Sequence, residues 1–444
     1  MNFPLRSTPL LAALLLGSGM VVEGTDVARA ADLVEVRSEF LVNGTGTAGG
    51  QHHATVAIND EGVFLVTWQS DFSSDLSQEI GARAFLSNGQ SWSEEFLVNT
   101  STRFGSQHSP DVANDGAAGW VVVWPSAEDH NLNKVYSKIY SSDGSSAPIK
   151  VQVDSFPHEP SPNINRPGVG MFANGDSVVI WGTADLQARE LKYFVRLFDR
   201  GGHALTDPIQ VNQAPSALSP PGGHTGTPDI AVREIDGEMT VFAAWKRWHE
   251  GEEYRAEIVC RKFNLHTMES GDEFLISPPA IGAHQGRPMV DINGRGDLLV
   301  VWQETNPADH RFDVHSLKFT AAEASWGYPL DPPGNADFSQ LLAQGLLSES
   351  GGVVLVWSRA FPDPMKSDVF LMMYNELGEP LLDQENRVNK TVRWDQKRPA
   401  LAMNEEDGLA SLAVIWESWG NDGSAMGVYG AVFEFDGFPE VRSD

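Results

Sequence analysis

The chain of 444 residues contains a single cysteine, Cys260, so no internal disulfide can form. This excludes the class of small exported proteins that are stabilised by a disulfide framework. Stability must instead come from a large core or a closed topology. Cys260 lies in the alternating run AEIVCRKF, which predicts a buried strand residue without a chemical role.

Basic residues are also scarce, with 31 Lys and Arg against 60 Asp and Glu and a formal net charge of −29. A nucleic-acid partner is excluded, because phosphates are bound by Lys and Arg. After the N-terminal segment, no stretch approaches the ~20 apolar residues of a membrane-spanning helix. We therefore expect no membrane span.

The first thirty residues have the features of a cleavable signal peptide. Arg6 precedes the short apolar run LLAALLLGSGMVV, and Ala28-Arg29-Ala30 has the small-x-small pattern of a cleavage site. We predict cleavage after Ala30, and a mature chain of residues 31–444 that forms one domain. The protein is expected to be secreted or periplasmic.

No segment has a sustained helical period of apolar residues, whereas short strand-like units recur. The pentapeptide EFLVN occurs at residues 39–43 and again at 95–99. An apolar run ending in tryptophan occurs seven times, at Trp68, Trp124, Trp181, Trp245, Trp302, Trp357 and Trp416. We expect these seven side chains to be buried between the units.

Each unit has the same order of four short strands separated by Gly, Asp and Asn turns, which predicts an all-β, seven-bladed β-propeller with four-stranded antiparallel blades. The last unit has only three strands of its own. The strand at 34–43, which carries the first EFLVN, is therefore expected to complete the last blade and close the ring. The predicted blades are 51–100, 107–153, 164–212, 226–278, 285–331, 337–389, and 396–436 together with 34–43.

The repeats resemble those of exported bacterial seven-bladed propeller proteins, in which Q-x-x-P-x-V-A, V-V-x-W and F-x-V-N recur. QHSPDVA, WVVVW and EFLVN carry the resemblance here, which covers the whole predicted mature chain. That group is functionally mixed, so the resemblance implies the fold and export but no activity. The turn SNGQSW at 87–92 is similar to a degenerate Asp-box of the sialidase type, which is a turn device only.

In propellers, the loops between blades and the loops between second and third strands share one face, here called the top face, around the central channel mouth. Arg166, Arg287 and Arg398 each precede a proline at equivalent blade positions. Three guanidinium groups there are candidates for binding the carboxylates of an acidic sugar. The competing interpretation is that they bond backbone carbonyls and fix the turns between blades.

Histidine and glutamine residues also gather just before the innermost strands. Neutral imidazole and amide groups from several blades are candidate ligands for a divalent metal such as manganese, zinc or calcium. Solvated loop histidines are the alternative. The candidate ligands are His52, His108, His224, His284 and Gln285.

Three tryptophans outside the repeated column, Trp248, Trp394 and Trp419, are predicted in loops of the same face beside acidic and amide residues. An exposed tryptophan of this kind stacks on the apolar face of a sugar ring. Packing of the loops onto the ring is the competing explanation.

No nucleophile elbow, zinc-binding HExxH or phosphate-binding glycine loop is present. The sequence therefore favours a module that binds a glycan, or an exported or cell-surface protein, through its top face. The alternative is a metal-assisted polysaccharide lyase or hydrolase acting on acidic glycans. It rests on a resemblance to propeller lyases, which implies a metal beside the uronate carboxylate and a basic residue that takes the α-proton.

Overall fold

The computed structural model describes residues 32–44, 49–71, 78–100, 105–117, 119–129, 132–141, 149–154, 166–185, 187–218, 227–249, 256–265, 267, 270–277, 283–321, 327–333, 338–362, 366–421, 423 and 425–438. The predicted signal peptide and His224 lie outside these residues. The described part of the chain includes no helix with the length and apolar character needed to cross a membrane.

Seven antiparallel sheets make up the fold. The first is β2 (Gln51–Ile58), β3 (Phe64–Asp71), β4 (Gln78–Phe85) and β5 (Phe96–Leu97). The second is β6 (Asp111–Asn114), β7 (Gly119–Asp129), β8 (Leu132–Ser141) and β9 (Ile149–Gln152). The third is β10 (Gly168–Met171), β11 (Ser177–Asp185), β12 (Glu190–Phe198) and β13 (Ile209–Gln210), with β14 (Ser216–Ala217) also paired to β12.

The fourth sheet is β15 (Asp229–Ile235), β16 (Glu238–Trp248), β17 (Ala256–Asn264) and β18 (Phe274–Ser277). The fifth is β19 (Gln285–Ile292), β20 (Leu298–Thr305), β21 (Phe312–Phe319) and β22 (Tyr328–Pro329). The sixth is β23 (Ser339–Leu347), β24 (Val353–Ala360), β25 (Ser367–Tyr374) and β26 (Asn386–Arg387). The seventh is β27 (Gln396–Glu406), β28 (Leu409–Trp419), β29 (Met426–Asp436) and β1 (Val34–Leu41).

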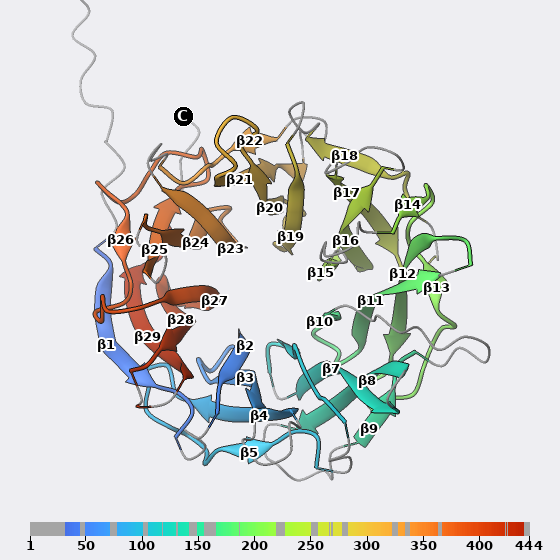
Figure 1. The fold of residues 1–444 in the computed structure, drawn as a ribbon, viewed down its shortest axis with the longest axis horizontal. Coiled ribbons are helices and arrows are strands. Elements are labelled where there is room, and N and C mark those ends of the chain that lie inside the picture. Colours follow the sequence, from blue (N-terminus) through green and yellow to red (C-terminus); the bar gives the residue numbers. More distant parts are fainter. Residues whose placement is uncertain are drawn as a thin grey trace, which may run out of the picture.

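The sheets stand side by side in a ring, with one strand of each next to the ring axis (Figure 1). The chain is thus a seven-bladed β-propeller, as predicted. The N-terminal strand β1 pairs with β29 and completes the last blade, which confirms the predicted closure of the ring.

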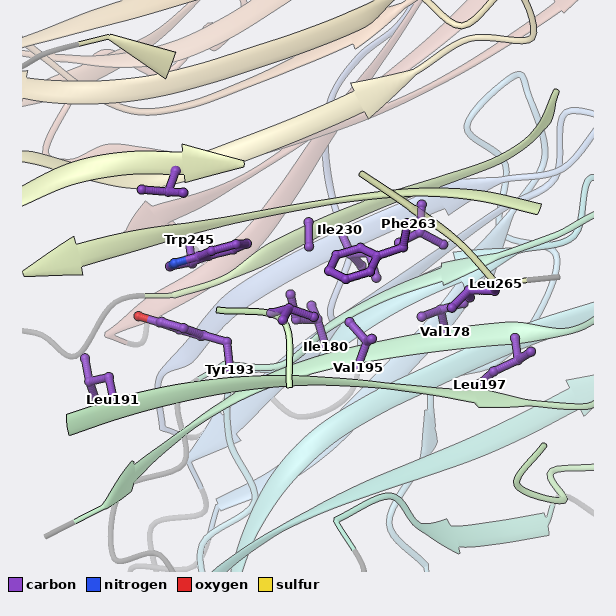
Figure 2. Packing of buried hydrophobic residues seen from close by; sticks show 14 of the residues in the cluster. Val178, Ile180, Leu191, Tyr193, Val195, Leu197, Ile230, Trp245, Phe263 and Leu265 are labelled. Atoms are coloured by element: carbon purple, nitrogen blue, oxygen red, sulfur yellow. The ribbon is translucent and has the colours of Figure 1, made fainter. Parts of the chain in front are cut away.

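The second strand of each blade is almost wholly apolar because both of its faces pack against neighbouring blades. The seven tryptophans of the repeat end these runs, and all are at most 5% exposed, which confirms that they are core residues. Figure 2 shows one such interface, where Trp245 of β16 faces Tyr193 of β12, with 6.0 Å between ring centroids. Cys260 is fully buried in the next interface.

The repeated EFLVN peptide has a structural role at both ends. Its asparagine accepts a hydrogen bond from the third strand of its own blade: Asn99 from Ile80 N at 2.9 Å, and Asn43 from Val428 N at 2.8 Å. Its glutamate holds the preceding blade. Glu95 accepts from Gly44 N at 3.0 Å, and Glu39 accepts from Lys390 N at 2.8 Å. The peptide is therefore a clasp between blades, and Glu39 and Asn43 use it to close the ring.

Candidate functional site

Five of the seven innermost strands have a left-handed backbone residue at or near their start, at an equivalent place in the repeat. His53, Ser109, Arg287, Leu342 and Arg398 have φ between 45° and 57°. The pairing register with the second strand shifts at four of these positions, as in a β-bulge. Bulges re-aim a side chain and end regular pairing.

The backbone N–H of the left-handed residue donates a hydrogen bond to a side chain of the preceding blade. Its acceptor is the side chain that directly follows the buried tryptophan of that blade's second strand. Four junctions share this arrangement: Gln69 with Ser109 at 3.2 Å, Gln303 with Leu342 at 3.2 Å, Ser358 with Arg398 at 3.1 Å, and Glu417 with His53 at 2.7 Å. We call the residue after the tryptophan the acceptor position. Pro125 and Gly182 hold it in two other blades and offer no acceptor, and Lys246 holds it in the fourth.

Arg166, Arg287 and Arg398 come from three blades, and their charges act on one another. Burial, with the positive charges of Arg398 and Arg166, lowers the pKa of Arg287 to about 10. We call Arg166, Arg287, Arg398, His53 and Glu417 the axial cluster. Protein atoms surround the Arg287 guanidinium closely enough to lower its pKa, yet the residue retains exposed surface, and among the described residues no carboxylate lies within ion-pair distance of it. The Nε of Arg398 is buried without a hydrogen-bond partner in the described part of the chain.

Glu417 is the negative member of the cluster and its side chain is fully buried. Burial opposes ionisation, but His52, Arg398 and the His53 amide outweigh it and lower the pKa of Glu417. Its carboxylate lies 3.4 Å from Arg398 Nη1 and 3.9 Å from His52 Nδ1, and His52 Nε2 contacts Asp71 at 3.3 Å. Glu417 is therefore ionised and neutralises only part of the positive charge around it.

His53 stays neutral in this setting. Burial, then the positive charges of Arg398 and Arg166, lower its pKa to about 3. An imidazole held neutral beside the guanidinium groups of Arg398 and Arg166 can accept or donate a hydrogen bond but adds no charge at neutral pH.

Two aspartates lie next to Arg166 and bind the backbone of the following blades. Asp111 accepts from Val169 N at 3.0 Å, and Asp229 from Val290 N at 2.8 Å. Burial raises the pKa of both, and the charge of Asp111 helps to bring that of Asp229 to about 7. They therefore offset the charge of Arg166 less than ordinary carboxylates do.

Lys246 stands beside Arg287 at the junction of the fourth and fifth blades. Its side chain is 7% exposed, and burial with the charge of Arg287 lowers its pKa to about 7. The Nζ atom lies 3.3 Å from His284 Nε2 and 3.9 Å from the ring centroid of Trp248. His284 Nδ1 lies 3.2 Å from the carbonyl of Gln285, so this nitrogen carries the hydrogen and Nε2 accepts from Lys246.

The candidate metal ligands are dispersed over different blades. His52 contacts Asp71 and Glu417, the backbone N–H of His108 bonds Pro125 O at 3.3 Å, and both nitrogens of His284 are engaged. Gln285 is fully buried, accepting from Ile258 N at 3.1 Å and donating to Glu304 at 2.6 Å. Within the described ranges, no group of three or more His, Cys, Asp and Glu side chains is arranged to hold a metal. With His224 outside those ranges, a metal site stays a prediction from the sequence.

The three tryptophans differ from one another. Trp248 ends strand β16 and is buried at 3%, with its ring 4.6 Å from that of His284, because the β16–β17 hairpin extends past the repeat tryptophan. Trp394 and Trp419 are 39% and 37% exposed. They lie at one corner of the seventh blade, where Trp419 N donates to Asp395 O at 3.0 Å and Trp394 packs against Gly420.

Glu417 and Lys246 are the functional candidates that the sequence reasoning missed. A signal was available, since aligning the seven units on their tryptophans places Gln69, Gln303 and Ser358 together with Glu417 and Lys246. Among these, only Lys246 lacks an acceptor when protonated.

Comparison with known proteins supports the fold and does not indicate an activity. The sequence matches no protein-family model and no curated protein. The chain is similar in structure to a protein of unknown function from Dyadobacter fermentans, with 10% identity and a TM-score of 0.50 over 91% of this chain and 99% of the other. It also matches an α-L-arabinanase from Penicillium chrysogenum, solved with arabinobiose, at 13% identity and a TM-score of 0.47 over 72% of this chain and 92% of the other. The polysaccharide lyase Uly1 matches at 9% identity and a TM-score of 0.48 over 92% of this chain and 98% of the other.

Proposed function

We propose that this protein is an exported β-propeller that binds the carboxylate groups of an acidic glycan at the top face of the ring. The observation that carries the proposal is the convergence of Arg166, Arg287 and Arg398 in a chain whose net charge is −29. Like charges brought together at the ends of bulged strands repel one another. An anionic ligand removes that cost.

The pairing inside the cluster supports the same conclusion. Glu417 is shared between Arg398 and His52, while Arg287 has no carboxylate partner in the described part of the chain. Arg presents a planar fork that binds a carboxylate through two parallel hydrogen bonds. Arg287 is therefore the member best placed to bind a ligand carboxylate.

Exposed aromatic rings support a glycan over other anions. Trp394 stands four residues before Arg398, and Trp419 two residues after Glu417, so both rings belong to the blade that carries two of the five members of the axial cluster. Stacking of a sugar ring on indole complements binding of its carboxylate. A small inorganic anion would make no stacking contact with these rings.

Binding of oligogalacturonate and of neutral dextran oligosaccharides, measured by titration calorimetry, tests the proposal. The wild type should bind the former only, with affinity that falls as salt rises. Arg287→Gln should weaken binding by about 10-fold or more, as expected for loss of a charge-assisted hydrogen bond. Arg233→Gln is the matched control, because Arg233 is 46% exposed at the far end of β15 and pairs with Glu349. Equal affinity for the neutral oligosaccharide, or an R287Q variant that binds as well as R233Q, would overturn the proposal.

A further inference from the structure

A cavity of about 490 Å³ opens in the sixth blade, and its described lining residues include no member of the axial cluster. This volume lies within the roughly 300–1,000 Å³ of small-ligand sites. Strands β24 and β26 flank β25 in the sheet, so side chains from these two strands stand on opposite sides of those from β25. Six of the residues that line the cavity carry its chemistry: Phe361, Asp368, Phe370, Glu385, Arg387 and Asn389.

Glu385 stands where three other blades place the glutamate of the clasp. In those blades the carboxylate accepts a backbone N–H that follows the fourth strand of the preceding blade: Glu39 from Lys390 N at 2.8 Å, Glu95 from Gly44 N at 3.0 Å, and Glu273 from Ala214 N at 3.1 Å. The equivalent residues before Glu385 are Pro332 and Pro333, which have no N–H. Glu385 instead bonds both Nη atoms of Arg359 in its own blade. Its carboxylate is thereby released from the junction between blades and lines the cavity.

The fourth blade holds an equivalent set of residues in a different arrangement. Arg247 and Arg359 both stand two residues after the repeat tryptophan, and they pair across the sheet with Glu257 and Asp368. In the fourth blade Glu257 accepts from Arg247 Nε at 2.6 Å and lies 3.0 Å from His249 Nε2. Asp368 is one methylene shorter, and Arg359 Nε is buried without a hydrogen-bond partner in the described part of the chain. The carboxylate of Asp368 therefore lies in the cavity wall, whereas an arginine and a histidine engage that of Glu257.

The polar part of the cavity wall is fixed by neighbouring side chains. Asp368 is 3% exposed and accepts from Asn389 Nδ2 at 2.8 Å. Arg359 holds Glu385 and also packs on Phe370, with its Cζ 4.3 Å from the ring centroid. Carboxylates held in this way present hydrogen-bond acceptors at set positions. Two of them in one wall repel an anionic ligand, so the wall suits the hydroxyl groups of an uncharged one.

An aromatic ring forms the opposite side of the cavity. Phe361 follows β24, and Phe338 holds its ring edge to face at 5.1 Å between centroids. A ring facing polar groups across a cavity suits a sugar, whose C–H face packs on the ring while its hydroxyls bond the polar wall. In a hexose of galacto configuration, the axial hydroxyl places the hydrogens of neighbouring ring carbons on one continuous apolar face. Glucose has only equatorial hydroxyls and lacks that extended face.

We propose that this cavity binds a neutral hexose of galacto configuration, as a second sugar site that is independent of the axial cluster. The apolar face of the sugar packs on Phe361, and its hydroxyls donate to Asp368 and Glu385. Arg387 is exposed beside these groups and donates to a sugar oxygen. The chain then holds two sites of different chemistry, one for uronate carboxylates and one for an uncharged sugar.

Ligand-observed NMR titration of the mature chain with methyl β-galactoside and methyl β-glucoside tests the proposal. The wild type should bind the galactoside more tightly than the glucoside. Asp368→Asn keeps an acceptor for Asn389 and should weaken galactoside binding by about 10-fold or more, through loss of a charge-assisted hydrogen bond. Phe361→Ala should weaken it by about 5-fold to 10-fold. Asp313→Asn is the matched control, because Asp313 holds the equivalent place in the fifth blade, opposite Glu304.

The outcomes separate this site from the axial cluster. R287Q should lose affinity for oligogalacturonate and keep that for the galactoside, whereas D368N and F361A should show the reverse. A wild type that binds neither glycoside, or both equally, overturns the proposal, as does galactoside binding that D368N and F361A leave unchanged. Loss of galactoside binding in R287Q would move the sugar to the axial cluster and refute the cavity as its site. If D368N fails to fold, F361A decides, because it changes a ring at the end of a strand without removing a buried hydrogen bond.

Discussion

The backbone N–H of His53 donates a 2.7 Å hydrogen bond to the buried carboxylate of Glu417, and this contact joins the first blade to the last. The same carboxylate contacts Arg398 and His52, so one side chain both closes the ring and sets the charge of the axial cluster. Stability and the charge of the proposed binding site are therefore linked at this residue.

Replacing Glu417 separates the two roles. Glu417→Ala leaves the His53 amide without its acceptor and should lower the free energy of unfolding by about 1–3 kcal/mol. Glu417→Gln should cost less, because Gln69 and Gln303 make the same contact in other blades. Urea titration of the two variants checks this, and equal destabilisation would contradict the acceptor rule.

As the pH falls from 8 to 5, Asp229 and Asp291 should favour the folded state, whereas His53, with its lowered pKa, should favour the unfolded one. Burial raises the pKa of Asp229 to about 7 and that of Asp291 to about 6. Both carboxyls thus take up a proton in the folded state at a pH where the unfolded chain does not. The stability they contribute is fully present below the unfolded pKa and is lost as pH rises through the folded pKa. Thermal unfolding of the wild type and of Asp229→Asn, which keeps an acceptor for Val290 N, isolates the contribution of Asp229: the wild type should gain stability relative to the variant as the pH falls across this range.

The clasp at Glu39 is expected to hold the N-terminal strand. Its carboxylate accepts from Lys390 N, from Thr391 N at 2.9 Å and from the Thr391 hydroxyl at 2.6 Å. Glu39→Ala should speed amide hydrogen exchange in β1 and β29 while leaving the blades opposite unchanged. Glu94→Ala, at an exposed glutamate beside the second EFLVN, is the control. Uniform protection in both variants would mean that strand pairing alone secures β1.

Exposed indole rings should report ligand binding. Trp394→Ala is expected to weaken oligogalacturonate binding by about 5-fold to 10-fold, in line with a stacking contact of about 1 kcal/mol. Trp92→Ala removes a ring that is 52% exposed elsewhere on the protein and should have no effect. Calorimetry compares the two, and similar losses would argue against a specific platform on the seventh blade.

The repeat was sufficient to predict the fold, but it predicted only part of the candidate site. Seven tryptophan runs and two copies of EFLVN sufficed for the blade number and the closing strand, because each unit must bury the same faces in the same order. The arginines before proline were likewise found by their equivalent positions. Each of these features is a periodic one.

What the sequence did not reveal depends on contacts between blades. Lys246 and Glu417 gain their properties from groups about 40 or more positions away in the chain, such as the His284 ring for Lys246 and the His53 backbone N–H for Glu417. Trp248 was expected in a loop because the apolar run ends at Trp245, yet hairpin pairing continues to Ala256 and buries it. The local sequence around Lys246, Glu417 or Trp248 does not show that a neighbouring blade buries the side chain.

The pairing of β1 with β29 also imposes an order on maturation. Asn43 bonds Val428 across 385 positions, so β1 has no pairing partner until β29 has been synthesised. Long-range strand pairing of this kind is slow, because the chain entropy must be lost before the contact forms. A product cut short before Met426 would display two open sheet edges, the kind of surface that aggregates or is degraded. Only a chain that contains both β1 and β29 can therefore close the ring and protect these edges.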